Sequence, residues 1–170
     1  MNNICKGYYR SPIGTLEIIG SRDGVSSILF VDDDVALGSI PTCLEECALQ
    51  LDDYFAGRRV EFSFPLDLQG TEFQKRVWRE LQKIPFGKTV SYLEVALAVG
   101  TREATRAVGR ANGQNPIVIV IPCHRVIGRD GSLTGYGGGV WRKRWLLDFE
   151  SPARQTSLFA IDVESNASHG

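Results

Sequence analysis

The sequence predicts an α+β fold in two parts: a small N-terminal α/β domain with a β-sheet and a helix, followed by a mainly helical C-terminal domain that contains a helix-turn-helix. Segments rich in β-branched and aromatic residues are concentrated before residue 32, whereas helix-capping patterns dominate after residue 70. The net charge also changes sign, from −6 over residues 1–70 to +6 over residues 71–150. We therefore place the domains at residues 1–68 and 69–150, and interpret residues 151–170 as a polar tail.

The composition argues against a disordered or membrane-spanning chain. Of 170 residues, 43% are hydrophobic and 23% are charged, as in ordinary globular proteins. No run approaches the ~20 apolar residues that cross a bilayer, and the first residues lack the apolar core of a signal peptide. We therefore expect a cytoplasmic protein without membrane association. In that reducing compartment we expect free thiols rather than disulfides at Cys5, Cys43, Cys47 and Cys123.

Three strands are predicted at the start of the N-terminal domain. Their sequences lie at Gly7–Arg10, Thr15–Gly20 and Val25–Val31. Short turn sequences that contain glycine separate them, at residues 11–14 and 22–24. These strands form the β-sheet of the predicted fold.

A helix is predicted next, over Thr42–Phe55. Thr42 and Glu45 have the spacing of a capping box, and apolar residues recur on one face: Leu44, Cys47, Ala48, Leu51 and Phe55. Cys43 and Cys47 are four residues apart, which also suits a metal, but no histidine or further cysteine lies near them. We therefore favour core packing over a metal site.

A linker and a second helix open the C-terminal domain. Residues 58–70 include Pro65 and lack helical periodicity, as is typical of a boundary. The helix is predicted over Thr71–Ile84, and its first residues, Thr71 and Gln74, form another capping-box pair.

Two short helices joined at a glycine follow. Ser91 caps the first, Tyr92–Val99, and Gly100 ends it. Thr101 caps the second, Arg102–Asn112. Two short helices around a tight turn are the pattern of a helix-turn-helix.

The second of these helices carries a row of arginines. Arg102, Arg106 and Arg110 are spaced by four residues, and small residues lie between them: Ala104, Ala107, Gly109 and Ala111. Small side chains allow a helix to approach a phosphate backbone closely, where the arginines bind. The alternative is a solvated surface face; the positive charge of this domain favours nucleic acid.

A cysteine follows a five-residue apolar run. Ile117–Ile121 contains no polar residue and must be buried, and it leads directly to Cys123, His124 and Arg125. Imidazole or guanidinium neighbours favour a thiolate, which is a strong nucleophile. The alternative, a buried cysteine beside a histidine that binds a backbone group, is about equally compatible with the spacing.

Glycine-rich segments and a final helix complete the domain. Residues 128–131 predict a hairpin turn, and Gly135–Gly139 predicts a loop that can lie against a planar ligand, with Tyr136 as a wall. The last helix is predicted over Trp141–Glu150.

The segment Ile121–Val126, with the sequence Ile-Pro-Cys-His-Arg-Val, resembles the active-site signature of the O6-alkylguanine-DNA alkyltransferases, or methylated-DNA–protein-cysteine methyltransferases. Further residues stand at the separations from Cys123 that this family uses: Tyr92, Arg106, Asn115, Tyr136 and Glu150. The resemblance covers residues 71–150 strongly and residues 1–56 more weakly. It is closest to the constitutive bacterial type, which has no additional cysteine-rich module.

The resemblance implies direct-reversal DNA repair. Cys123 would attack the alkyl carbon of O6-alkylguanine and pass its proton through a water to His124, which Glu150 orients. Asn115 would hold the turns around the site, and Tyr92 would donate a hydrogen bond to the purine. The product is a thioether that water does not cleave, so the transfer would be irreversible and stoichiometric. Activity on O4-alkylthymine, the preferred alkyl group and cooperative assembly on DNA stay open.

The resemblance also implies how damaged double-stranded DNA is held. The second helix of the helix-turn-helix would enter the minor groove, and Arg106 would fill the gap left by the flipped nucleotide. The expected DNA-binding residues are Tyr92, Ala104, Arg106, Ala107, Arg110, Asn112 and Gly113. The expected substrate-binding residues are Tyr92, Val126, Tyr136, Gly137 and Gly138. Gly137 replaces a serine found in some members, which removes one hydrogen-bond donor.

We expect no cofactor, because the DNA supplies the alkyl group, and no metal. Some members bind zinc through N-terminal cysteine and histidine residues, but the histidines here are His124 and His169, and Cys5 alone cannot form that site.

We also expect a monomer. The rival functions are a non-catalytic lesion-binding protein, which would lack the nucleophile, and a cysteine hydrolase, which would not need the arginine-lined helix.

Overall fold

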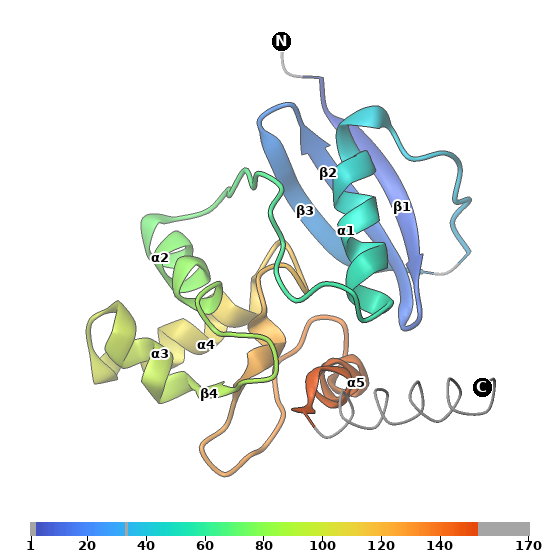
Figure 1. Cartoon of the computed structure of the whole chain (residues 1–170). Helices are drawn as coiled ribbons and strands as arrows, with labels where there is room; N and C mark the ends of the chain where they lie inside the picture. Colours follow the sequence, from blue (N-terminus) through green and yellow to red (C-terminus); the bar gives the residue numbers. More distant parts are fainter. Residues whose placement is uncertain (1–2, 33, 153–170) are drawn as a thin grey trace, which may run out of the picture.

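A three-stranded antiparallel sheet forms one end of the molecule in the computed structural model, which describes residues 3–32 and 34–152 (Figure 1). The strands are β1 (Cys5–Ser11), β2 (Gly14–Ser21) and β3 (Gly24–Val31), in that spatial order. The turns predicted between the strands are confirmed, and Gly14 and Gly24 begin β2 and β3 with positive φ angles. The sheet and the helical second part confirm the predicted α+β class.

Helix α1 (Glu45–Phe55) covers one face of this sheet and follows a 3₁₀ turn, η1 (Thr42–Leu44). The helix is predicted correctly, but the capping box at Thr42 is wrong. Pro41 is the N-cap residue of the 3₁₀ turn, and no side chain caps it. The turn instead places the fully buried Leu44 against the sheet, so core packing rather than a local cap fixes this end.

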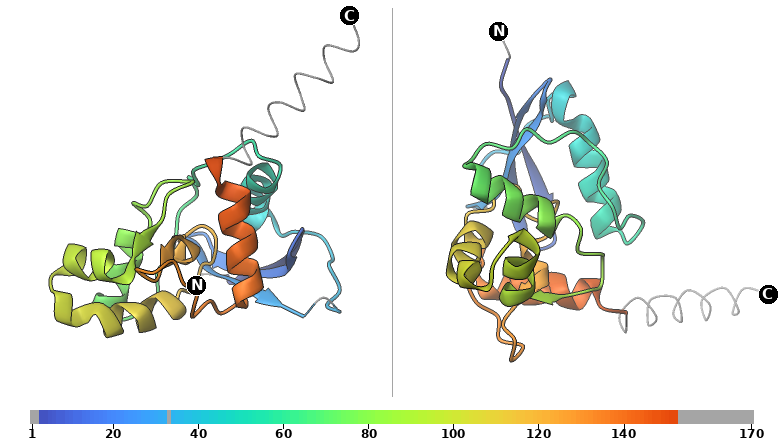
Figure 2. Two further views of the ribbon diagram at one scale, coloured as in Figure 1. Left: turned by 90° about the horizontal axis from the view of Figure 1, so that it is seen from below. Right: turned by 90° about the vertical axis from the view of Figure 1, so that its left-hand side faces the viewer.

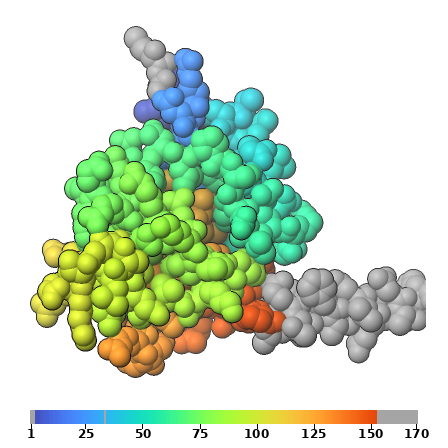
Figure 3. Space-filling model, turned by 60° about the vertical axis from the view of Figure 1, so that its left-hand side comes forward, coloured from blue at the N-terminus to red at the C-terminus, as the bar shows by residue number. Residues whose placement is uncertain are grey.

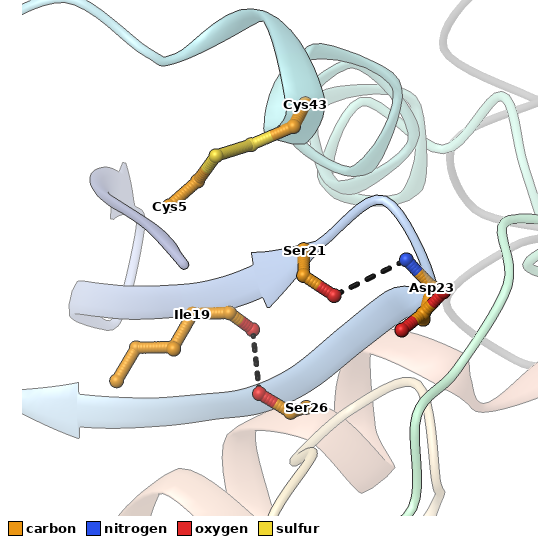
Figure 4. Close-up of a disulfide and its surroundings, with 6 residues drawn as sticks. All are labelled: Cys5, Ile19, Ser21, Asp23, Ser26 and Cys43. Carbon is orange, nitrogen blue, oxygen red and sulfur yellow. Dashed lines mark hydrogen bonds between the residues drawn. A yellow bond between two sulfur atoms is a disulfide. The ribbon is translucent and has the colours of Figure 1, made fainter. Parts of the chain in front are cut away.

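The expectation of four free thiols is also wrong. Cys5, at the start of β1, forms a disulfide with Cys43 of η1 (Figure 4). The two residues are 38 positions apart, so their proximity arises from packing of η1 beside the sheet and not from any local pattern. Cys47 and Cys123 are free and buried. Burial raises the pKa of Cys47 to about 12, which agrees with the predicted role in the core.

The outer edge of β3 is covered by two segments from elsewhere in the chain. Leu66, in the linker, forms a parallel bridge with Val25. Ile117 forms another with Ile28, whose N–H donates to the carbonyl of Pro116 at 2.9 Å. These bonds satisfy backbone groups that an open sheet edge would expose. They also attach the segment before Cys123 to the N-terminal sheet.

The second part of the chain is mainly helical. Its elements are α2 (Glu72–Leu81), β4 (Val90–Ser91), α3 (Tyr92–Val99), η2 (Arg102–Ala104), α4 (Thr105–Gly113), η3 (Cys123–Arg125), β5 (Val126–Ile127) and α5 (Val140–Glu150). The capping boxes at Thr71 and Ser91 are confirmed, with both reciprocal hydrogen bonds. The helix predicted to reach Ile84 ends at Leu81.

The turn predicted at residues 128–131 forms: the N–H of Gly131 donates to the carbonyl of Gly128, and the N–H of Gly128 donates to the carbonyl of Ser132, both at 2.9 Å. The strand before this turn, β5, pairs in parallel with β4. Pairing of Val126 with Val90 therefore connects the segment around Cys123 to the start of α3.

Helix α5 lies near α1, and α3 and α4 project to one side of it (Figure 2). Its aromatic residues pack on α1: Phe149 lies 5.4 Å from Tyr54 and Trp145 lies 6.0 Å from Phe55, between ring centroids. None of the described helices is long and apolar enough to cross a membrane. The tail predicted over residues 151–170 falls, from residue 153 onward, outside the described residues.

Candidate active site

Cys123 follows a buried segment that is folded as consecutive turns, not as a strand. Ile119 in this segment has a φ of +73°, which is unusual for a β-branched residue. Asn115 holds both ends of the segment. Its side-chain nitrogen donates to the carbonyl of Ile121 at 2.7 Å, and its side-chain oxygen accepts from the N–H of Ile117 at 2.9 Å. The predicted positioning role of Asn115 therefore has a geometric basis.

Cys123 is 3% exposed and lies in the wall of a cavity of about 200 Å³. Other residues in the wall are Leu29, Phe30, Asn112, Gly113, Asn115, Val118, Gly137 and Gly138. Burial raises the pKa of the thiol to about 11, although the Asn115 amide and the charge of Lys143 lower it in part. The thiol is therefore protonated at neutral pH and needs a proton acceptor before it can act as a nucleophile.

His124 and Glu150 form a buried pair beside the cysteine. Nε2 of His124 lies 2.9 Å from Oε2 of Glu150. Nδ1 of the same ring is buried and has no hydrogen-bond partner among the described residues. This arrangement orients the imidazole and leaves one ring nitrogen available to exchange a proton.

Glu150 receives several hydrogen bonds. Arg125 donates to both carboxylate oxygens, at 2.8 and 2.9 Å, and Tyr54 donates at 2.6 Å. Burial alone would raise the pKa of Glu150, but His124 and Arg125 outweigh it and hold the pKa well below its ordinary value. Arg125 also donates to the carbonyl of Ile84. Its guanidinium therefore fixes Glu150, and it does not favour the thiolate as the sequence suggested.

Lys143 is the cation that lowers the pKa of Cys123, and sequence reasoning missed it. It is fully buried in α5, and its Nζ donates to the carbonyl of Thr134 at 3.1 Å and to the hydroxyl of Tyr92 at 3.4 Å. A signal was present in the sequence, because Lys143 precedes the buried Leu146 by three residues and shares its helix face. Tyr54 was missed in the same way, three residues after Leu51 on the buried face of α1.

The glycine-rich loop forms one side of the cavity. The hydroxyl of Tyr136 is buried and, in the part of the chain that the structure describes, lacks a hydrogen-bond partner. Burial raises its pKa well above the ordinary value, as does the neighbouring Cys123. A Cβ at Gly137 would meet nothing within 4 Å, whereas a Cβ at Gly138 would lie 2.8 Å from the ring of Phe30. The loop can therefore take a side chain at Gly137 but not at Gly138.

The helix pair α3 and α4 presents the arginine row to solvent. Arg102, Arg106 and Arg110 are all exposed, and the pair projects at the surface beside the segment near residue 130 (Figure 3). Ala104 and Ala107 are half-buried and Gly113 is exposed. Asn112, expected at the DNA surface, is instead 3% exposed and donates to the carbonyl of Cys123 at 3.3 Å. It faces inward because α4 packs this side against the active-site turn.

Among residues 3–32 and 34–152, no three histidine, cysteine, aspartate or glutamate side chains lie together as a metal site would require.

Val126 is buried in β5, and Tyr92 is half-buried, with its hydroxyl donating to the carbonyl of Thr134 at 3.2 Å. The structure therefore brings Cys123, His124 and Glu150 into one group, with Tyr92 linked to it through Lys143.

Two family models match the chain. The model described as "6-O-methylguanine DNA methyltransferase, ribonuclease-like domain" matches residues 4–68. The model described as "6-O-methylguanine DNA methyltransferase, DNA binding domain" matches residues 72–152. A relative named methylated-DNA–protein-cysteine methyltransferase, from Mycolicibacterium paratuberculosis, is 48% identical over 89% of this chain and 95% of the relative. Another of that name, from Methanosarcina acetivorans, is 42% identical over 84% of this chain and 95% of its own.

Solved structures agree with these relatives. The Mycobacterium tuberculosis O6-methylguanine methyltransferase is 43% identical with a TM-score of 0.79, covering 92% of this chain and 99% of that one. The M. tuberculosis OGT in complex with DNA is 46% identical with a TM-score of 0.76, covering 88% and 96%. From its sequence, its fold and the environment of its buried cysteine, the chain belongs to the 6-O-methylguanine DNA methyltransferase family.

Proposed function

We propose that this protein repairs DNA by transferring the alkyl group of O6-alkylguanine irreversibly to its own Cys123. The observation that carries the proposal is the single buried arrangement of a free thiol in a small cavity, a neighbouring His124, and a Glu150 that fixes the imidazole. The family membership and the DNA complex of a relative support DNA as the partner.

The transfer is a displacement at the alkyl carbon. The Cys123 thiol loses its proton toward Nδ1 of His124, through an intervening water, and the sulfur attacks the carbon. A C–S bond forms as the C–O bond breaks, and the electron pair of the C–O bond passes to guanine O6. The guanine anion then takes up one proton, so the products are S-alkylcysteine and ordinary guanine.

Glu150 and Tyr92 have separate tasks in this reaction. Glu150 is held ionised by Arg125 and His124, so it can stabilise the imidazolium that forms when the thiol loses its proton. The Tyr92 hydroxyl accepts a hydrogen bond from Lys143 and donates to the Thr134 carbonyl in the free protein; when the flipped base binds, this O–H turns to the purine and stabilises the developing charge on the leaving guanine. Tyr136, Gly137, Gly138 and Val126 bound the flipped base.

DNA is bound through the minor groove by α4. Arg106 is exposed on this helix and takes the place of the flipped nucleotide, while Arg110 binds phosphate. Ala104 and Ala107 allow close approach of the helix. The protein acts as a monomer on double-stranded DNA, because one chain contains the nucleophile, the proton acceptor and the DNA-binding helix.

Duplex DNA carrying a labelled O6-methyl group tests the proposal. One labelled methyl group per protein molecule, bound in an acid-stable form, is the expected result. Labelled methanol released over many turnovers would instead identify a hydrolase. Tight binding of the lesion without any transfer of label would identify a non-catalytic lesion-binding protein.

A further inference from the structure

Arg142, in the first turn of α5, joins segments that lie far apart in the chain. Its Nε donates a 2.7 Å hydrogen bond to the carbonyl of Ile13, in the turn between β1 and β2. Its Nη1 donates at 2.8 Å to the carbonyl of Gly138, in the glycine-rich loop. The guanidinium also stacks on Phe30 of β3, with Cζ 4.2 Å from the ring centroid. Arg142 therefore ties the loop beside Cys123 to the N-terminal sheet.

Phe30 and the loop together form one side of the cavity that holds Cys123. A Cβ on Gly138 would lie 2.8 Å from the Phe30 ring and 3.2 Å from the Arg142 side chain, so the three are in tight contact. The cavity measures only about 200 Å³. A displacement of Phe30 or of the loop would therefore change the space available next to the sulfur.

Binding of DNA phosphate does not explain the position of Arg142. Its Nε and Nη1 are occupied by backbone carbonyls. Its guanidinium lies between two aromatic rings, with Cζ 4.2 Å from the Phe30 centroid and 4.6 Å from the Trp141 centroid. These contacts direct the guanidinium into the protein, where it determines how the loop and β3 pack.

We propose that the N-terminal sheet sets the size of the alkyl group that the protein accepts. Phe30 is the specificity-determining wall, and Arg142 is the positioning residue that holds Gly138 against it. The inference rests on the proposed function, because the alkyl group must lie in this cavity to reach Cys123. An apolar pocket discriminates by about 10–200-fold between substrates that differ by one methylene, so removal of a whole aromatic ring from the wall is a large change.

The first test compares single-turnover transfer from O6-methylguanine and O6-benzylguanine in the same DNA duplex. Phe30→Ala should raise the ratio of the benzyl rate to the methyl rate by about tenfold or more, and Phe30→Leu should raise it less. Tyr8→Ala is the matched control, because Tyr8 of β1 is also a half-buried aromatic residue of the sheet but does not line the cavity of Cys123. Its rate ratio should equal that of the wild type.

The second test addresses Arg142. Arg142→Met keeps the apolar stem but removes the hydrogen bonds, so the loop should loosen and the benzyl-to-methyl ratio should rise. Arg142→Lys should restore the wild-type ratio in part. Arg144→Gln, at an exposed position of the same helix, should leave the ratio unchanged. A purely structural role for Arg142 would lower both rates alike and leave their ratio constant, which would overturn its assignment.

If Phe30→Ala fails to fold, Phe30→Leu decides the question. An unchanged ratio in a folded Phe30→Leu that transfers methyl normally would overturn the inference about the sheet. Absence of methyl transfer by the wild-type protein would reject the proposed function instead, so the two failures are distinct.

Discussion

Tyr54 and Glu150 are 96 positions apart, and the Tyr54 hydroxyl donates a 2.6 Å hydrogen bond to the Glu150 carboxylate. Tyr54 belongs to α1, in the N-terminal part, whereas Glu150 ends α5 and orients His124 beside the nucleophile. Burial raises the pKa of Tyr54 well above its ordinary value, and the negative charge of Glu150 and its hydrogen bond with the tyrosine raise it further. The tyrosine is therefore a hydrogen-bond donor over the whole neutral range, and the N-terminal part helps to fix the Glu150 carboxylate.

The first prediction concerns Glu150→Gln. Its partners Arg125 and His124 would lose a buried anion, and breaking such a pair typically costs about 3–5 kcal/mol of stability. Because the folded-state pKa of Glu150 lies below the ordinary 4.5, its ionised form contributes stability above that pH, and this contribution is lost as the pH falls through the folded-state pKa. We expect the free energy of unfolding to fall less steeply with acidification in the variant.

Denaturant unfolding between pH 7 and pH 3 measures this difference. Tyr54→Phe is the milder comparison, since it removes one hydrogen bond to Glu150 and keeps the charge; we expect a loss of about 1–3 kcal/mol. Identical acid dependence in Glu150→Gln and the wild type would show that Glu150 does not carry the linkage.

The second prediction concerns Lys143, whose charge partly offsets the effect of burial on Cys123. Lys143→Met should raise the pKa of the thiol above about 11, and thus reduce the thiolate fraction at every lower pH. Transfer and iodoacetamide alkylation at Cys123 should both slow, and both rate profiles should shift to higher pH. Lys83→Met, at an exposed lysine paired with Glu80, is the control. A uniform drop in rate without a shift of the profile would contradict this role for Lys143.

Local signals explain which parts of this structure the sequence could predict. Ser91 and Glu94 form a reciprocal cap within three residues, so the start of α3 follows from sequence alone. The pairing of Cys5 with Cys43 depends on how η1 packs, and no short pattern encodes it. The same holds for the contact between Tyr54 and Glu150, which forms only after the two parts of the chain have come together.

In the site, too, local sequence signals predict some features, and others depend on tertiary packing. Cys123 is predictable because it directly follows an apolar run, and the burial of that run is confirmed except at the half-buried Val120. The residues that surround the cysteine in space are harder to predict from the sequence. Arg125 is only two positions from Cys123 yet binds Glu150, whereas Lys143, twenty positions after the cysteine, acts on the thiol. Sequence adjacency does not determine the direction of a side chain in a turn.

The third prediction separates DNA distortion from chemistry. Arg106→Ala should slow repair of duplex DNA more than reaction with free O6-benzylguanine, because only the duplex requires base flipping. Arg22→Ala is the matched control: it removes an exposed arginine from the turn between β2 and β3, away from α4. Equal losses on the two substrates in Arg106→Ala would argue against a role in flipping.

Binding should also weaken as the salt concentration rises, with little dependence on base sequence. The residues 71–150 carry a net charge of +6, and the arginines of α4 lie at the surface. Loss of one phosphate contact in Arg110→Ala should reduce the slope of log K against log salt by about 1. Titrations at several salt concentrations measure this slope, and an unchanged slope would place Arg110 away from phosphate.

The fourth prediction concerns Gly137→Ser. A Cβ at this position meets nothing within 4 Å, so the serine should be tolerated without loss of stability. We expect the hydroxymethyl group to occupy space needed by bulky adducts and to lower the ratio of benzyl to methyl transfer. The wild type should accept O6-benzylguanine in DNA. An unchanged or higher ratio in the variant would instead mean that the serine acts as a hydrogen-bond donor to guanine O6.

Mass spectrometry of the protein after reaction with duplex DNA containing O6-methylguanine tests the central claim most directly. The account predicts one methyl group on the peptide that contains Cys123, no transfer in Cys123→Ser despite retained DNA binding, and normal transfer in Cys47→Ser. A methyl group on any other cysteine, or repair that continues in Cys123→Ser, would contradict it.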